Sequence, residues 1–448
     1  MPVVKANGSQ RTMLYWEQFA PVNACHVLEL GPNCPTTAER FREVVPQVLR
    51  RLGVGNVTAD AQSHQYHIDV EGGCEITQQS ASMNFEQDVE EILNREFQRP
   101  FARNSCPVRF VWVEQQLNEM QPSPPRRLFV VSYRHAVADG ASIRVICQQL
   151  LAAFEDRQSG GVVTIYEGRL WQDLRQIEHP PGPWGMFVSA VSGLMSLTRC
   201  MYPKLRDRSD QDRSITKFHA DSIPVAHIRE TASSLNVTVH DLLFAATLEG
   251  LSREDAVKHR GRIRSQMAMG SPVDLRQYLG HLPDDLFGQL LGTFQVRCDV
   301  QNSSFREILS RVHEQTTSQK RRKDAVYYPF QMGITSFFSR RFPRDSGAKT
   351  TQSMFPILGG ISNSNLVESF RLEFESGVLV RYARATHLGH MLPMMLFITS
   401  FGENMTFMSS RRESYLCDDA MHRIVAHLVR RARGEFDDCP PDVQVAGT

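Results

Sequence analysis

The stretch YRHAVADG, residues 133–140, places a histidine, an aspartate and a glycine at the spacing HxxxDG. The run that leads into it, LFVVSYRH (128–135), is rich in β-branched and aromatic residues, which is typical of a buried strand. After it, apolar residues recur at helical spacing from Ile143 to Phe154, so a helix with one buried face begins just past Asp139. The motif is therefore predicted to be a strand-to-helix turn.

Histidine at this position is suited to acid–base chemistry. Its unperturbed pKa, about 6.5, lets it take up a proton at neutral pH and return it. At the end of a strand, His135 has a rigid backbone behind it and open space ahead, which favours a general base. If the strand alternates, His135 shares a face with Val131 and Tyr133, whereas Arg134 points the other way.

Asp139 and Gly140 are candidates for holding the loop that aims His135. The carboxylate of Asp139 can cap the incoming helix or pair with a distant arginine, and Gly140 permits a backbone turn that a Cβ atom would obstruct. The alternative interpretation is a histidine that serves only the core or the surface beside a helix cap.

Length and composition limit the classes of protein to which this chain can belong. A chain of 448 residues with 41% hydrophobic and 22% charged residues is expected to fold as two domains or two halves of one unit. A net charge of +1 gives no global field for nucleic acid. Nine scattered cysteines without a CxxC pair indicate reduced thiols. No apolar leader or membrane span is seen, so we expect a cytoplasmic protein.

The rest of the chain mixes helices and strands in both halves. Helices are predicted over 36–52 and 86–97 and from about Asp418 onward, and 395–410 is predicted to form a β-hairpin. Residues 176–215 are typical of a connector with an embedded short helix. The fold class is therefore α/β, with two halves of similar make-up.

Three stretches together resemble a known superfamily. HAVADGAS (135–142) after an apolar strand resembles the HxxxDG signature of the chloramphenicol acetyltransferase-like superfamily, which includes peptide condensation domains and free-standing acyltransferases. SPVDLRQYL (271–279) and GGISNSNL (359–366) are similar to its "PVDLR" and "SN" segments, in the same order and spacing. The resemblance covers about residues 85 to 410. It implies an α+β sandwich in which two acetyltransferase-like halves, 1–175 and 216–448, form a V around a central tunnel, joined by the connector 176–215.

The resemblance also implies an activity. An acyl thioester, on coenzyme A or on a carrier-protein phosphopantetheine arm, would donate its acyl group to an alcohol or amine, with no tightly bound cofactor and no metal. His135 would be the base, Asp139 and Gly140 would organise the loop, and Arg276 would pair with Asp139 across the halves. Ser271, Ser362 and Asn363 are candidates for lining the tunnel near the oxyanion because they lie in the matching segments.

Departures from the family patterns reduce the number of subfamilies that this chain resembles. Arg134 stands where many peptide condensation domains have a first histidine, and no DFGWG motif of plant acyltransferases follows, so a free-standing condensation-like acyltransferase remains. One alternative is a non-catalytic protein that binds a carrier protein or lipid. Another is a lipid acyltransferase at a membrane surface, suggested by MFVSAVSGLMSL (186–197) and FFSRRF (337–342).

Two further sequence patterns give weaker indications of function. The basic run KRRK (320–323), with Arg340, Arg341 and Arg344, would suit coenzyme A phosphates or an acidic carrier protein but is typical of a solvated helix end. The paired histidines of HQYH (64–67) and HLGH (387–390) lack a third ligand for a metal.

Overall fold

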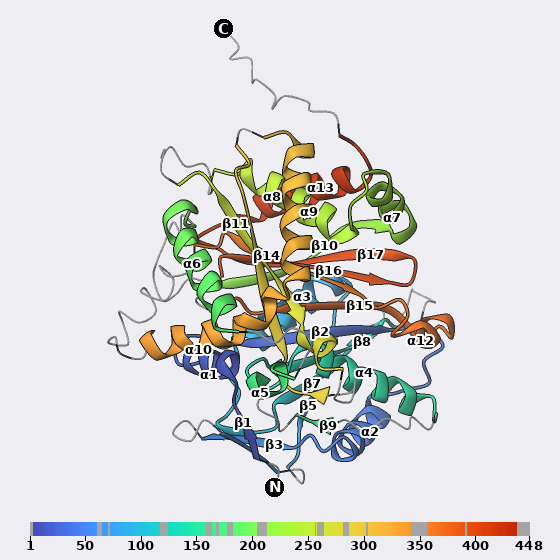
Figure 1. Cartoon of the computed structure of the whole chain (residues 1–448). Coiled ribbons are helices and arrows are strands. Elements are labelled where there is room, and N and C mark those ends of the chain that lie inside the picture. The colour runs from blue at the N-terminus through green and yellow to red at the C-terminus, as the bar shows by residue number, and fades with distance from the viewer. Residues whose placement is uncertain are drawn as a thin grey trace.

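A computed structural model describes residues 3–436 of the chain, except 61–64, 70–71, 117–123, 158–163, 167–169, 177–181, 204–212, 256, 258–263, 281–285, 302, 340, 342–355 and 390–391 (Figure 1). Arg340, Arg344, His64 and His390 of the sequence patterns lie outside the described residues. Two mixed sheets, each covered by helices, make up the body of the molecule.

The first sheet contains the strand that leads into the HxxxDG motif. Its order is β15 (Leu379–Thr386), β2 (Asn23–Leu30), β8 (Arg127–Arg134), β7 (Val108–Gln115) and β5 (Glu75–Ala81). All eight residues of β2 are buried, because both faces of this sheet are covered. The predicted neighbours β7 and β8 pair antiparallel.

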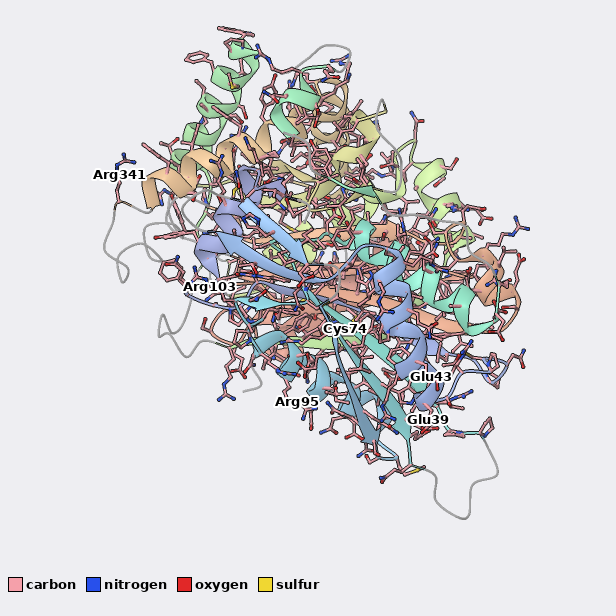
Figure 2. The ribbon with its side chains drawn as sticks, turned by 90° about the horizontal axis from the view of Figure 1, so that it is seen from below. Glu39, Glu43, Cys74, Arg95, Arg103 and Arg341 are labelled. Atoms are coloured by element: carbon pink, nitrogen blue, oxygen red, sulfur yellow. The ribbon has the colours of Figure 1, made fainter. Side chains whose placement is uncertain are left out.

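Helices cover both faces of the first sheet. α2 (Ala38–Arg51) and α4 (Gly140–Phe154) pack on one face, and α3 (Phe85–Gln98) packs on the other. α2 follows its amphipathic pattern, so that Glu39 and Glu43 lie on its exposed side in Figure 2. The helices and paired strands predicted for this half are confirmed.

A small antiparallel sheet and the first helix complete this half. The small sheet contains β1 (Val3–Lys5), β4 (Gln65–Asp69), β3 (Asn56–Asp60) and β6 (Asn104–Ser105). α1 (Gly8–Trp16) begins at a capping box formed by Asn7 and Gln10.

The second sheet takes six strands of the described chain. In order, they are β10 (Ser214–Pro224), β17 (Asn404–Arg412), β16 (Met394–Phe401), β14 (Gly359–Asn365), β11 (Met267–Asp274) and β13 (Leu291–Cys298). β16 and β17 form the predicted hairpin around Gly402, whose φ of +58° suits glycine.

The helices of the second half pack on this sheet. They are α7 (Val225–Ser234), α8 (Val239–Ser252), α9 (Phe305–Arg321) and α13 (Asp418–Ala432), with the short helices η1 (Leu275–Tyr278) and η2 (Asp324–Tyr327). The short helix α12 (Arg371–Glu375) instead packs against β15 of the first sheet. Capping boxes at Thr238 and Ser304 start α8 and α9. Their buried sides and α13 share one core with the sheet.

The two halves interlock instead of meeting only at a surface. β15 comes from the second half of the sequence but completes the edge of the first sheet, where it pairs with β2. The strands β9 (Thr164–Ile165) and β12 (Leu286–Phe287) pair parallel across the halves. A buried apolar cluster also joins β2 and α3 to β15, β16 and β17. The resulting arrangement confirms the mixed α/β class and fixes how the halves face each other.

Three other helices lie beside this junction. α6 (Pro183–Arg199) is the helix within the expected connector, and it contacts α10 (Tyr328–Ser339) through a hydrogen bond between Ser189 and Gln331. α5 (Leu170–Leu174) precedes the connector. α10 packs against α1, where the Thr12 hydroxyl donates to the Met332 carbonyl oxygen over 2.7 Å.

The contact between α1 and α10 predicts the effect of a single methyl group. A Cβ atom on Gly8 would lie 1.8 Å from the carbonyl oxygen of Pro329, so Gly8→Ala forces the two helices apart. We expect a loss of about 1–3 kcal/mol in the free energy of unfolding, measured by urea denaturation. Gly193→Ala on α6 is the control, because nothing lies within 4 Å of a Cβ atom there. Equal stability of both variants would contradict the packing described here.

Candidate active site

His135 follows directly after β8 and is held by backbone contacts. Its N–H donates to the carbonyl oxygen of Val22 over 3.0 Å, and its ring Nδ1 lies 3.1 Å from the carbonyl oxygen of Ala138. Because a carbonyl oxygen only accepts, this contact favours the tautomer with the proton on Nδ1. The lone pair on Nε2 is then left to accept a proton.

The surroundings of His135 keep its imidazole neutral. Burial lowers the pKa of His135, whereas the Ala138 carbonyl and the Asp139 carboxylate raise it. Burial has the larger effect, so the pKa lies below the usual histidine value of 6.5. At neutral pH the ring is therefore in the form that a general base requires.

The Asp139 carboxylate is fully buried and fully engaged. It caps α4 by accepting from the backbone N–H of Ser142 over 3.0 Å, and it accepts from the Ser142 hydroxyl as well. It also accepts from the Leu290 N–H over 2.8 Å. A carboxylate with no exposed surface and this many donors is fixed in position.

Arg276 is the partner of Asp139, as expected from the resemblance of its PVDLR segment. Its Nη1 and Nη2 atoms lie 2.8 and 3.1 Å from the two Asp139 oxygens, a bidentate ion pair across the halves. Burial raises the pKa of Asp139, but the charge and hydrogen bonds of Arg276 outweigh it and hold the pKa below its usual range. Nε of Arg276 donates to the Leu286 carbonyl oxygen over 3.0 Å, so η1 is tied down too.

Arg134 points away from His135, as strand alternation predicts. Its guanidinium donates to the Glu17 carboxylate with contacts of 2.9 and 2.5 Å. The residue at the position of a first family histidine is thus part of a buried ion pair on the opposite face of β8.

A cavity of about 380 Å³ lies between the two halves. His135 lines it, and so do Gly140 from the first half and Ser271, Ser362 and Asn363 from the second. These four predicted residues therefore line the same cavity as His135. Asp139 and Arg276 do not line it and lie behind its wall. The volume falls in the range of small-molecule sites.

Gly140 acts differently from the expectation. It is the first residue of α4 and has no positive φ, so the expectation that the backbone turn requires a glycine here is wrong. A Cβ atom there would lie 3.4 Å from Nε2 of His26 and 3.7 Å from the Tyr133 hydroxyl. The absence of a side chain widens the cavity at this point.

The three second-half candidates come from adjacent strands. Ser271 lies on β11, and Ser362 and Asn363 lie on β14, which pairs parallel with β11. The Oδ1 atom of Asn363 is buried and has no hydrogen-bond partner among the described residues. These side chains can supply polar contacts to a ligand, although none of them touches His135 in a contact that defines a catalytic pair.

Sequence reasoning missed a second histidine in the cavity. His26 on β2 is buried, its Nδ1 is hydrogen-bonded to the Tyr382 hydroxyl, and its ring meets that of Tyr133 edge-on at 5.6 Å. Burial, followed by the charges of Arg384 and Arg144, lowers the pKa of His26 well below its usual value. A lone histidine in the apolar strand ACHVLEL was the available signal.

Of the two weaker sequence signals, the basic run lies away from the cavity, whereas one of the paired histidines lines it. Lys320 and Arg321 end α9, Arg322 pairs with Asp324, and none of these lines the cavity, so the run is a solvated helix end. His387 does line the cavity, and burial lowers its pKa to about 4. The described residues contain no cluster that could hold a metal ion.

Comparison with known proteins identifies the fold. No family model matches the chain. Gramicidin S synthase 2 of Brevibacillus brevis is 24% identical over 272 residues, which are 58% of this chain but only 6% of that protein. The chain therefore spans a small part of this curated relative.

Two solved structures show the same architecture. The trichothecene 15-O-acetyltransferase TRI3 of Fusarium sporotrichioides matches with a TM-score of 0.68 at 11% identity, over 97% of this chain and 96% of that one. The condensation domain of the Monacolin K polyketide synthase MokA matches with a TM-score of 0.67 at 12% identity, over 97% of each chain. The chain has the chloramphenicol acetyltransferase-like fold that these condensation and acetyltransferase structures share.

The buried ion pair predicts unequal costs for two neighbouring carboxylates. Asp139→Asn leaves the Arg276 charge without its buried partner and should lower the free energy of unfolding by about 3–5 kcal/mol. Asp274→Asn is the matched control, since Asp274 contacts the same guanidinium at 3.1 Å but its side chain is 39% exposed, and it should cost about 1 kcal/mol or less. Chemical denaturation of both variants measures the difference. Equal losses in the free energy of unfolding would show that the Asp139–Arg276 ion pair stabilises the fold no more than the exposed Asp274 contact does.

Proposed function

We propose that this protein is an acyltransferase that moves an acyl group from a thioester to a hydroxyl or amino group. The observation that carries the proposal is a neutral His135, with Nε2 free, on the wall of a cavity built by both halves. The likeness to an O-acetyltransferase and a condensation domain supports it through the fold.

The reaction needs one proton acceptor and one route for the leaving thiol. Nε2 of His135 takes the proton of the acceptor O–H or N–H as the acceptor atom attacks the thioester carbonyl carbon. The C–S bond then breaks, an ester or amide forms, and the imidazolium returns the proton to the leaving thiolate. No covalent acyl-enzyme is required.

The other site residues position His135 and stabilise the charge that develops in the reaction. Asp139 and Arg276 fix the loop that aims His135, because their ion pair anchors the start of α4 to the second half. Ser271, Ser362 and Asn363 are the candidates for donating to the developing oxyanion. A binding protein without catalysis would be favoured by an Asp139 carboxylate turned into the cavity, whereas this carboxylate is bonded to Arg276.

The donor carries its activated group as a thioester, on coenzyme A or on the phosphopantetheine arm of a carrier protein. The acyl group would then enter as a co-substrate, with no tightly bound cofactor. The partial match to a peptide synthase supports a carrier protein as one partner, and the acetyltransferase likeness supports a small-molecule acceptor.

The proposed base predicts a specific loss and a specific pH profile. His135→Ala should lower kcat/KM by about 10²- to 10⁴-fold, measured as thiol release from acyl-coenzyme A and acyl-carrier donors with a panel of alcohols and amines. Activity requires the neutral imidazole, and burial lowers the pKa of His135, so kcat/KM should fall only below pH 6.5 as the ring becomes protonated.

The control for this measurement is His227→Ala, which removes an exposed histidine on α7 and should leave the rate unchanged. Wild-type rates for His135→Ala with donors and acceptors that the wild type uses would remove the proposed role. An acidic limb centred above pH 6.5 would contradict the burial argument.

An apolar surface favours the membrane-surface reading as a second candidate. Among the described residues, large apolar side chains are exposed on α6 and on the adjoining α10: Trp184, Phe187, Val188, Val191, Met195, Phe330, Ile334 and Phe337. The guanidinium of Arg341 lies 3.7 Å over the ring of Phe337 and marks the far end of α10 in Figure 2. No described helix is both long and apolar enough to cross a bilayer. Such a surface suits an interfacial position.

Vesicle binding distinguishes this candidate. If the surface of α6 and α10 docks on lipid, the protein should float with phosphatidylcholine vesicles that contain phosphatidylglycerol, and Phe187→Asp with Phe337→Asp should abolish flotation. Leu372→Asp is the matched control, because Leu372 is an equally exposed apolar residue on α12. Absence of flotation for the wild type would remove this candidate and leave the acyl transfer proposal standing.

A further inference from the structure

Two arginines line the cavity without a carboxylate partner. Arg384 lies on β15 directly opposite His26 of β2 in the sheet register, and Arg144 lies on α4 one turn after Gly140. Both side chains line the cavity. A strand of one half and a helix that starts at the HxxxDG loop thus bring two cations to the same wall.

The hydrogen-bonding capacity of these arginines is mostly unused. Arg384 donates from Nη2 to the Ser362 carbonyl oxygen over 3.1 Å, and its Nε atom is buried without a partner in the described chain. For Arg144 the described residues provide neither a hydrogen bond nor an ion pair. An unpartnered, buried guanidinium donor is costly, and a ligand atom would satisfy it.

No acidic group of the cavity balances these charges. Among the described lining residues the acidic one is Asp274, and it is bonded to Arg276. Burial lowers the pKa of Arg384, and repulsion from the positive charge of Arg144 lowers it further. An anion between them would relieve both the repulsion and the unmade hydrogen bonds.

The rest of the wall is largely apolar. Lining side chains with no charge include Met13, Trp16, Val22, Leu392, Met395 and Phe397. A ligand that fits both parts has an apolar body and one anionic end. A guanidinium presents a planar fork of donors that matches the two oxygens of a carboxylate.

We propose that Arg144 and Arg384 form a subsite for a carboxylate group of the substrate. The proposal rests on the acyl transfer function and specifies its substrate class: a hydroxy or amino acid acceptor, or an acyl donor with a free carboxylate at its far end. In either case the carboxylate is bound at the Arg144–Arg384 wall, and the reacting group lies toward His135.

The test measures binding without turnover, in the full chain carrying His135→Ala. Isothermal titration calorimetry compares acids with their methyl esters in two arms. The acceptor arm uses ω-hydroxy acids from hydroxyacetate to 8-hydroxyoctanoate, and the donor arm uses N-acetylcysteamine monothioesters of dicarboxylic acids. In one of the arms the acid should bind at least about tenfold more tightly than its methyl ester, and that arm identifies which substrate carries the carboxylate.

Arginine variants tie the preference to the wall. Arg144→Gln and Arg384→Gln should each remove most of the preference for the acid, and Arg384→Lys should keep part of it, because the charge remains while the fork is lost. Arg322→Gln is the control, since Arg322 is an exposed arginine at the end of α9. Circular dichroism confirms that each variant is folded.

The outcomes separate this proposal from the function on which it rests. Equal binding of acids and methyl esters in both arms overturns the subsite. An unchanged preference for the acid in the double variant Arg144→Gln, Arg384→Lys overturns it as well. A clear preference for the acid, together with a wild-type protein that transfers no acyl group from any donor, supports the subsite and contradicts the transfer reaction.

Discussion

The ion pair between Asp139 and Arg276 is the constraint on which the site depends. It is bidentate, has no exposed carboxylate surface, and joins the start of α4 to the segment after β11. Because breaking one side of such a pair leaves an uncompensated buried charge, the two halves are held in one relative position at this point. The backbone between β8 and α4 is then fixed, and with it the direction of the His135 ring. The same pair places Asp139 behind the cavity wall, so that it acts on the loop instead of on a ligand.

Burial sets the protonation states inside the cavity. Both His135 and His26 have pKa values below the usual histidine value, so both imidazoles are uncharged at neutral pH. The positive charge of the cavity comes from Arg144 and Arg384 instead. Neutral imidazoles and fixed cations therefore line the same cavity, where the imidazoles suit a reacting hydroxyl or amine and the cations suit an anion.

The sequence predicted the local structure well and the long-range structure only in part. The strand, turn and helix around His135 follow from a run of β-branched residues, a capping aspartate and a helical apolar pattern, and all three are present. The partner of Asp139 could be predicted only because the PVDLR segment resembles a known family. The crossing of β15 into the first sheet could not be predicted, since pairing between distant strands leaves no mark in local periodicity. For that reason Arg384 and its neighbour His26 escaped notice, and Gly140 was assigned a turn where it in fact makes room.

Alkylation by a reactive donor analogue tests the central claim, that Nε2 of His135 faces the position of the thioester carbonyl. The bromoacetyl thioester of N-acetylcysteamine places an electrophilic carbon next to that carbonyl, and peptide mapping by mass spectrometry identifies the modified side chains. We expect an adduct on His135, and slower formation of that adduct as pH falls and the ring becomes protonated. The exposed thiol of Cys417 serves as the internal standard for reagent reactivity. An unmodified His135 after Cys417 has reacted completely would contradict the account.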